Sequence, residues 1–367
     1  MSATSEQLEN VLSSYRVCSS PEQVNWKIRK QVDEQAIRDT LLPGLVSFLK
    51  PAICRRSVVA LSGGLDSTVA MYLVAHTINH YRERDYDVSD FHLSVVHYPG
   101  LEDADGKALV HAVQARFPKV NVNYIEFNAL PALQALAKES HRRTAPFTRK
   151  QVPGPGLLFT RTIVGITHEI AARLECQAIN TTNGTEYLLG EYADGICFSV
   201  SPFINLYKST LYGLGRVLGV PEHILQRRPV NSAFPFTDKL KLYFGDVPKE
   251  VSPQAAFETL DAMLYFLTEK SMTPRSLALR TDHSMEFLAR LANLVDRQKP
   301  RMIYRVLGTE DKKEKNDGLI VVPYADVLSR ETSETLLLPE ETKSGKKVLE
   351  DYEKGSIGHT AFYYGGG

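Results

Sequence analysis

Residues 62–67 (Ser-Gly-Gly-Leu-Asp-Ser) combine two adjacent glycines with two serine hydroxyls and one carboxylate. Where no Cβ is in the way, backbone N–H groups can close around an anion. A helix that starts here would add partial positive charge. Asp66 adds a hard oxygen ligand of the kind that Mg²⁺ prefers. These residue types at this spacing predict a cradle for phosphate groups.

The segments on either side of the cradle have the patterns of a buried strand and a packed helix. Residues 57–61 are apolar after Ser57 and include two valines, as expected for a parallel strand covered on both faces. The apolar spacing after Ser67 is that of a helix packed on a sheet. A Walker loop is excluded, because it requires G-x-x-x-x-G-K-[ST] and this turn contains no lysine. The alternative is an ordinary strand–turn–helix with a glycine turn.

The motif Ser-Gly-Gly-x-Asp-Ser resembles the pyrophosphate loop of the N-type ATP pyrophosphatases, which cleave ATP between the α and β phosphates. The match between a strand and a helix favours this function over a plain glycine turn. The resemblance implies ATP and Mg²⁺ as cofactors, with Asp66 as a metal ligand. It also implies an ATP-binding loop made of Ser62, Gly63, Gly64, Leu65, Asp66 and Ser67.

Strand and helix patterns alternate along the chain beyond this motif. Strands are expected at 91–97, 120–127 and 177–180, and helices at 102–116, 129–138 and about 157–174. The alternation predicts an α/β fold with a doubly wound parallel sheet and right-handed crossovers. His97 ends the second strand, at the edge where open α/β sheets bind ligands. Upstream, the apolar spacing over 20–50 predicts a helix that is bent or interrupted at Pro43.

Residues 140–156 break this alternation. Basic residues lie on both sides of Pro146, and Pro-Gly-Pro-Gly follows at 153–156. The segment is too polar for a core and too long for a simple connection, so we interpret it as a mobile cover over an active site. A solvated basic loop is the alternative.

A second block of motifs begins directly after the strand expected at 177–180. It comprises residues 181–186, Gly190, residues 194–195, Pro202, residues 206–208 and residues 218–221. In order and approximate spacing this block resembles the central segment of the NAD synthetases. The resemblance implies a Rossmann-like fold of the adenine nucleotide alpha hydrolase type, with a helical C-terminal part in which residues 260–265 are followed by a helical hairpin to Arg297.

The NAD synthetase resemblance also implies how the chain is divided. It extends over residues 25–305. Residues 1–24 are expected to be a loose N-terminal segment, and residues 306–367 a small appended segment that ends in a flexible Gly-Gly-Gly tail. Alternatively, the carboxylate of such a tail could itself be adenylated.

Five positions receive a role from this resemblance. Thr181 is expected to contact ATP, and Glu186 to share Mg²⁺ with Asp66. Lys208 is expected to bring a cation to the ATP phosphates, with Arg161 as a second. Asp66, Glu186 and Lys208 would be the catalytic residues, acting by positioning and charge neutralisation. The alternatives are a solvated loop carboxylate for Glu186 and a surface lysine for Lys208.

The implied reaction has two halves. A small-molecule carboxylate attacks the α-phosphorus of ATP and pyrophosphate leaves, and ammonia then displaces AMP from the acyl-adenylate to give an amide. No glutaminase segment is recognisable in the sequence, so nitrogen is expected as free ammonia or from a separate partner. The family also implies a homodimer.

The part of the sequence that would bind the acid departs from the family pattern. His97, Asp194 and Asp238 are the candidates for contact with the acid. Differences from the family occur over 102–105, 191–193, 198–201 and 230–232, and the family's Asp-Glu pair is replaced by Asp238-Lys239. We therefore expect nicotinic acid adenine dinucleotide to be a poor substrate unless the cations of 141–150 or the C-terminal segment replace the lost contacts. The alternatives are a related enzyme that adenylates a different carboxylic acid, and a nucleotide-binding regulator without turnover.

Composition argues against several other classes of protein. The 43 Lys and Arg residues balance 43 Asp and Glu residues, so no net charge attracts the chain to nucleic acid or to an anionic membrane. The four cysteines are scattered and form no C-x-x-C pair, which argues against a zinc site, a disulfide framework and sulfur transfer. No apolar run approaches the ~20 residues needed to cross a bilayer, and the first residues do not resemble a signal peptide. A cytoplasmic enzyme is expected.

Overall fold

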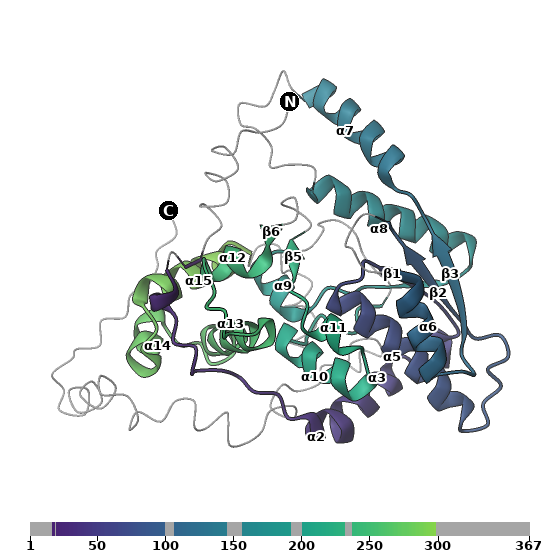
Figure 1. Ribbon diagram of the computed structural model, residues 1–367, viewed down its shortest axis with the longest axis horizontal. Helices are drawn as coiled ribbons and strands as arrows, with labels where there is room; N and C mark the ends of the chain where they lie inside the picture. The colour runs from purple at the N-terminus through teal and green to yellow at the C-terminus, as the bar shows by residue number, and fades with distance from the viewer. Residues whose placement is uncertain are drawn as a thin grey trace, which may run out of the picture.

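The computed structural model describes residues 17–18, 20–99, 106–144, 156–191, 200–231 and 237–298. A four-stranded parallel sheet lies within this part of the chain (Figure 1). In the order β3-β2-β1-β4, it comprises β1 (Arg56–Leu61), β2 (His92–His97), β3 (Asn121–Glu126) and β4 (Gln177–Ile179). Because β2 and β3 lie on one side of β1 and β4 on the other, the winding direction reverses between β1 and β4. The predicted doubly wound α/β fold is confirmed.

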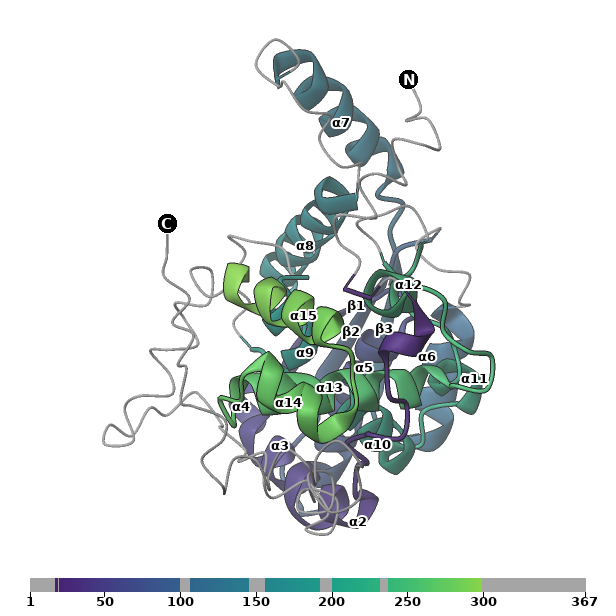
Figure 2. The same ribbon diagram turned by 90° about the vertical axis from the view of Figure 1, so that its left-hand side faces the viewer.

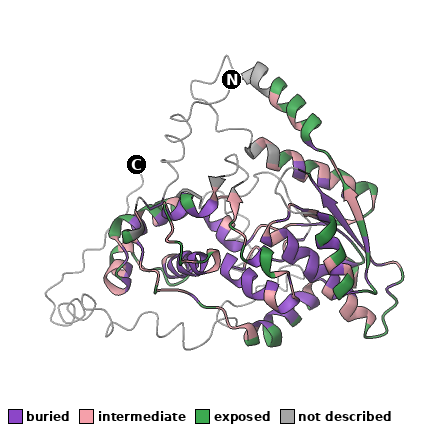
Figure 3. Cartoon of the chain, viewed as in Figure 1, coloured by how far each residue is buried: buried purple, intermediate pink, exposed green. Residues whose placement is uncertain are grey.

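Side chains of β1 alternate between the two faces of the sheet. Val58 shares a small apolar cluster with Ile163 of α8 (Gly156–Arg173). Val59 instead belongs to the main core, which also contains side chains of α5 (Leu65–Arg82) and α6 (Gly106–Arg116). Figure 3 shows buried residues along the strands and the helices that pack on them. Burial on both faces explains why β1 has a continuous apolar sequence.

A layer of helices follows the sheet in the sequence. Helix α10 (Lys208–Leu218) packs against both α5 and α13 (Pro253–Thr268), and α14 (Pro274–Thr281) and α15 (Met285–Gln298) continue from α13 (Figure 2). Residues 260–265 lie in α13, and the helical hairpin expected to run to Arg297 corresponds to α14 and α15, which pack against each other. Thr273 caps a new helix at Pro274, and Asp282 ends that helix in the left-handed conformation (φ 55°).

Short elements lie between β4 and α10 and between α10 and α13. They are α9 (Gly184–Leu189), α11 (Glu222–Leu225), α12 (Lys239–Phe244) and the antiparallel pair β5 (Val230–Asn231) and β6 (Thr237–Asp238).

The N-terminal helix starts later than predicted. After the 3-10 turn η1 (Pro21–Gln23), the first α-helical residues belong to α2 (Glu34–Ala36), which is capped by Asp33. The helix then continues as the π-helical turn η2 (Ile37–Leu41) and as α3 (Leu42–Phe48), and the short α4 (Pro51–Cys54) follows. The widened turn η2 lies just before Pro43, the position of the predicted bend. Proline offers no N–H and its ring crowds the preceding turn, which accounts for the interruption.

Helix α7 (Leu130–Thr144) extends beyond its predicted end and projects from the sheet (Figure 2). Residues 140–144 of the predicted active-site cover therefore belong to a helix. Residues 145–155 lie outside the described residues, as do 1–16 and 299–367. In the described part of the chain, no helix is both long and apolar enough to cross a bilayer.

Candidate active site

In the glycine loop between β1 and α5, serine hydroxyl groups form hydrogen bonds with the backbone of the same loop. Gly63 has a φ of 87°, a conformation that favours glycine, and Gly64 lies at the N-cap of α5. The hydroxyl oxygen of Ser67 accepts the N–H of Ser62 at 3.2 Å, and that of Ser62 accepts the N–H of Gly64 at 3.2 Å. The loop therefore gathers backbone N–H groups and hydroxyls at the N-terminus of an 18-residue helix, as an anion site requires.

A second loop meets the first at the end of β4. Asn183 is fully buried and caps α9, accepting the N–H of Glu186 at 3.0 Å on its side-chain oxygen. The carboxylate of Glu186 accepts the N–H of Asn183 in return at 3.4 Å, which completes a capping box. The amide nitrogen of Asn183 also lies 3.4 Å from a carboxylate oxygen of Asp66. Asn183 therefore joins the loops that follow β1 and β4, at the point where the sheet reverses direction.

Three carboxylates and two lysines converge beside these loops. Lys208 forms an ion pair with Asp66, and its ammonium lies 3.9 Å from Glu186 Oε1. The ammonium of Lys239 lies 2.7 Å from the same Glu186 oxygen and 2.5 Å from Glu191 Oε2. We call Asp66, Glu186, Glu191, Lys208 and Lys239 the carboxylate–lysine cluster. With all five groups ionised, its three carboxylates exceed its two ammonium groups by one negative charge.

Burial and neighbouring charges oppose each other in this cluster. Burial raises the pKa of Asp66, with Lys208 acting in the opposite direction. Burial would also raise the pKa of Glu186, but Lys239 and Lys208 together bring it below its usual value. Burial would lower the pKa of Lys239, but Glu186 and Glu191 outweigh it, so that pKa is raised. Lys239 is therefore held in its charged form.

A buried carboxylate from α13 supports the cluster from behind. Asp261 is fully buried and accepts the Thr185 hydroxyl at 2.6 Å and the backbone N–H of Ser209 at 2.8 Å. The Thr185 oxygen in turn accepts the backbone N–H of Lys208 at 2.8 Å. One side chain thus fixes the residues next to Glu186 and Lys208. Burial raises the pKa of Asp261 to about 6.

The two described residues that were predicted to bind the acid, His97 and Asp238, contact different neighbours. His97 lies at the end of β2, and its Nδ1 is 2.8 Å from the hydroxyl of Tyr124. Asp238 caps α12 through the N–H of Leu240 and pairs with Arg228 at 2.8 Å, so its carboxylate is engaged locally. Asp194 lies outside the described residues.

Of the remaining predicted ATP contacts, Leu65 is buried at the start of α5 and Thr181 is half-buried before α9. Arg161 is exposed on α8 and, among the described residues, makes no hydrogen bond or ion pair with the cluster.

The two carboxylates predicted to bind metal form a donor set that suits Mg²⁺. Asp66 and Glu186 both face one cation, the ammonium of Lys208. Within the described ranges, no group of three or more His, Cys, Asp or Glu side chains could hold a metal ion. Mg²⁺ is usually held by one or two carboxylates together with substrate phosphates, so two oxygen ligands next to a phosphate loop are sufficient.

Several residues of the site were not predicted from the sequence. They are Asn183, Thr185, Glu191, Lys239 and Asp261. The Asn-x-x-Glu spacing at 183–186 was a readable capping signal. In the sequence, Lys239 stands out only because it replaces an acidic residue of the family pattern. In the structure its ammonium pairs with the Glu186 carboxylate. Asp261 lies in an apolar helix pattern that gives no indication of its partners.

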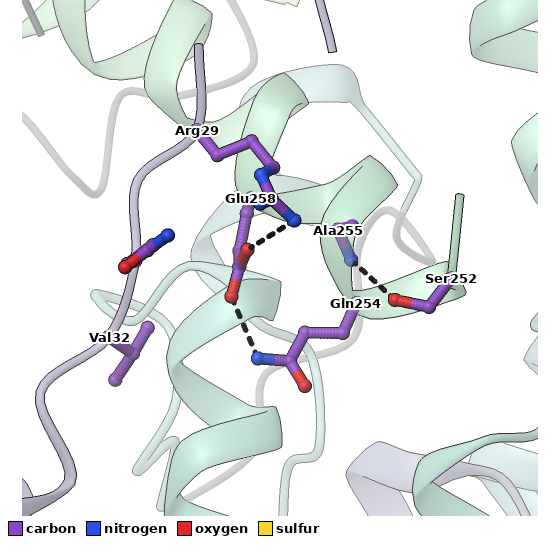
Figure 4. A pocket seen from close by; sticks show the side chains of 7 residues that line it. Arg29, Val32, Ser252, Gln254, Ala255 and Glu258 are labelled. Atoms are coloured by element: carbon purple, nitrogen blue, oxygen red, sulfur yellow. Dashed lines mark hydrogen bonds and ion pairs between the residues drawn. The ribbon is translucent and has the colours of Figure 1, made fainter. Parts of the chain in front are cut away.

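A polar pocket lies at the start of α13, and none of the predicted site residues lines it (Figure 4). Arg29 pairs with Glu258 across it at 3.8 Å, and the Gln254 amide donates to Glu258 at 2.7 Å. Ser252 caps the helix by accepting the N–H of Ala255 at 3.2 Å. The Arg29–Glu258 pair joins the N-terminal segment to α13.

Comparison with known proteins adds an independent line of inference. The family model described as NAD synthase matches residues 40–302. The chain is 28% identical over 229 residues to the NH(3)-dependent NAD(+) synthetase of Methanopyrus kandleri, covering 60% of this chain and 69% of that protein. It is 22% identical over 254 residues to the protein of that name from Pyrococcus furiosus, covering 68% and 87%. Among solved structures, NMN synthetase from Francisella tularensis is 19% identical, with a TM-score of 0.49 and coverage of 73% and 95%.

Proposed function

The chain belongs to the NAD synthase family, and on this basis we propose that it converts nicotinic acid adenine dinucleotide to NAD with ATP and ammonia. The acid carboxylate attacks the α-phosphorus of ATP and pyrophosphate departs. Ammonia then attacks the carbonyl carbon of the acyl-adenylate and AMP leaves. The amide takes its nitrogen from ammonia, and the displaced carboxylate oxygen leaves on AMP.

The observation that carries the proposal is the position of the glycine loop beside the carboxylate–lysine cluster. Residues 62–67 lie at the end of β1, and Asp66 within them contacts both Lys208 and Asn183. A phosphate chain in the loop would thus lie next to a buried ammonium and two carboxylates. The proposed reaction places negative charge on phosphate oxygens in its transition state, and preorganised charges of the protein stabilise that state.

Each part of the site has a separate task in this proposal. The N–H groups and hydroxyls of Ser62 to Ser67 bind the departing pyrophosphate, exchanging their contacts within the loop for contacts with phosphate. Lys208 neutralises phosphate charge, and Thr181 and Arg161 are proposed further contacts with ATP. Asp66 and Glu186 are proposed to hold Mg²⁺, which when bound supplies neutralisation of the phosphate oxygens.

The acid is proposed to bind at the sheet edge near His97, with Asp194 and Asp238 as further candidates. We also propose a cytoplasmic homodimer that receives ammonia free or from a separate partner.

The test is a product analysis of the purified chain with ATP, Mg²⁺, ammonium and nicotinic acid adenine dinucleotide. The expected products are NAD, AMP and pyrophosphate in equal amounts, formed only when all components are present. ADP and phosphate as products would contradict the loop assignment. Pyrophosphate release with another carboxylic acid, but not with this dinucleotide, would retain the adenylation step and overturn the substrate.

A further inference from the structure

Lys239 lies between two carboxylates, one in the first turn of α9 (Glu186) and one just after its end (Glu191). Its ammonium is 2.7 Å from Glu186 Oε1 and 2.5 Å from Glu191 Oε2, and the residue is only 7% exposed. An ammonium so far from water needs a charged partner. Because it has two, it can lose one and remain paired.

Glu191 is held in place by contacts that do not involve the Glu186 carboxylate. Its backbone N–H donates to the Glu186 carbonyl at 2.8 Å, after Gly190 has turned the chain in the left-handed conformation (φ 75°). The hydroxyl of Tyr243 donates to its second carboxylate oxygen. Lys239 and Tyr243 are four residues apart on α12 and therefore lie on the same face of that helix. One helix face thus engages both oxygens of Glu191.

The same Glu186 oxygen that contacts Lys239 is one of the proposed metal-binding atoms. A divalent cation can bind there fully only if the Lys239 ammonium withdraws from it. We propose that Glu191, fixed by Tyr243, is a holding site that keeps Lys239 paired while Glu186 exchanges its lysine for a divalent cation. The inference rests on the proposed function, because it takes Glu186 as a metal ligand.

Two substitutions should act in opposite directions. Lys239→Met removes the competitor and should strengthen cation binding about tenfold, the size of one charge-assisted hydrogen bond. Glu191→Gln leaves Lys239 with Glu186 alone and should weaken cation binding about tenfold for the same reason. A purely structural role for either residue would weaken binding in both variants.

The double variant distinguishes the exchange of Lys239 between the two carboxylates from a general effect of the Glu191 charge on cation binding. If Glu191 acts through Lys239, Glu191→Gln has no further effect once Lys239 is methionine, and the double variant should match Lys239→Met within about twofold. If Glu191 acts only through its negative charge, the double variant should lose the full tenfold again.

The experiment is a Mn²⁺ titration of the free full-length protein, followed by the electron paramagnetic resonance signal of unbound Mn²⁺. Circular dichroism checks the fold of each variant, and Glu169→Gln on the exposed face of α8 serves as the control. Effects of the same sign in both single variants, or a full Glu191→Gln effect in the double variant, would overturn the holding site. Should Lys239→Met not fold, unchanged affinity in Glu191→Gln alone overturns it.

Failure of the proposed function has a different signature. Mn²⁺ binding that Asp66→Asn and Glu186→Gln leave unchanged would remove both the metal assignment and this inference. Normal sensitivity to those two variants, with the wrong pattern at Lys239 and Glu191, would remove only the inference.

Discussion

Asp261 and Thr185 connect α13 to α9 through a hydrogen bond of 2.6 Å between fully buried side chains. The Asp261 carboxylate accepts the hydroxyl of Thr185, the residue before Glu186. It also accepts the backbone N–H of Ser209, the residue after Lys208. The two proposed catalytic groups therefore share one support, although they belong to different helices.

Asp261→Asn should disturb that support at both ends. An asparagine can accept one hydrogen bond at its oxygen but directs an N–H₂ group at the other donor. At pH 4 we expect a loss of about 2–4 kcal/mol in the free energy of unfolding, and at neutral pH at least a tenfold fall in pyrophosphate release. Urea unfolding and a turnover assay measure the two. Asp246→Asn, at a side chain that is 86% exposed, should change neither, and an Asp261→Asn variant with normal turnover would contradict the support.

Stability should depend on pH through the same residue. Burial raises the pKa of Asp261 from 3.8 to about 6, so the folded state binds this proton more tightly than the unfolded state. The resulting stability is present below pH 3.8 and is lost as pH rises through 6. About two pKa units at 1.36 kcal/mol each give a loss of about 3 kcal/mol.

Urea unfolding between pH 4 and pH 7 tests this, with Asp261→Asn as the reference without the titrating group. The stability difference between wild type and variant should narrow as pH rises. A difference that is constant or widens would show that the carboxyl does not titrate in this window.

The fold and the phosphate loop could be predicted because their signals are local. The two valines of β1, the paired glycines and Asp66 lie within a dozen residues, and strand–helix alternation then determines a parallel sheet. The start of the first helix at Glu34 was missed because periodicity does not locate a cap such as Asp33.

The carboxylate–lysine cluster could be predicted only in part. Asp66, Glu186 and Lys208 followed from motifs, but their mutual contacts depend on the sheet order. Lys239 approaches Glu186 because β5, β6 and α12 return to the sheet edge from 53 residues along the chain. No periodicity in the sequence encodes such a return.

Asp66→Asn and Glu186→Gln should each lower turnover by on the order of 10²-fold or more. Each amide keeps the shape of the side chain but removes a charge that faces the phosphate loop. Amides are preferable to alanine, because they keep an oxygen that can accept a hydrogen bond from the buried ammonium groups of Lys208 and Lys239. The matched control is Glu169→Gln, whose side chain is 63% exposed in a pair with Arg173. Turnover within threefold of wild type in either cluster variant would contradict the catalytic assignment.

Two glycine substitutions should shift stability in opposite directions. Gly63→Ala places a Cβ on a residue with a φ of 87° and should cost about 1–2 kcal/mol. Gly165→Ala adds a methyl group within α8 where nothing outside the adjacent helix backbone lies within 4 Å and should gain about 0.5–1 kcal/mol. Thermal unfolding measures both. Only Gly63→Ala should also raise the KM for ATP, so an equal rise in both variants would exclude a specific role for the loop.

Gly106→Ala offers a test of whether His97 contacts the acid. A Cβ on Gly106 would lie 2.6 Å from Cγ of His97, so the imidazole must shift from its place beside Tyr124. If His97 binds the acid, the KM for the acid should rise at least fivefold while the KM for ATP changes little, since the glycine loop is attached to a different strand.

Tyr124→Phe is the companion variant, because it removes the hydroxyl that lies 2.8 Å from His97 Nδ1 and leaves the ring volume nearly unchanged. It should raise the same KM by a smaller factor. Steady-state kinetics with each substrate varied in turn decides the matter: lowered thermal stability with both KM values unchanged would make His97 a packing residue and move the acid site elsewhere along the sheet edge.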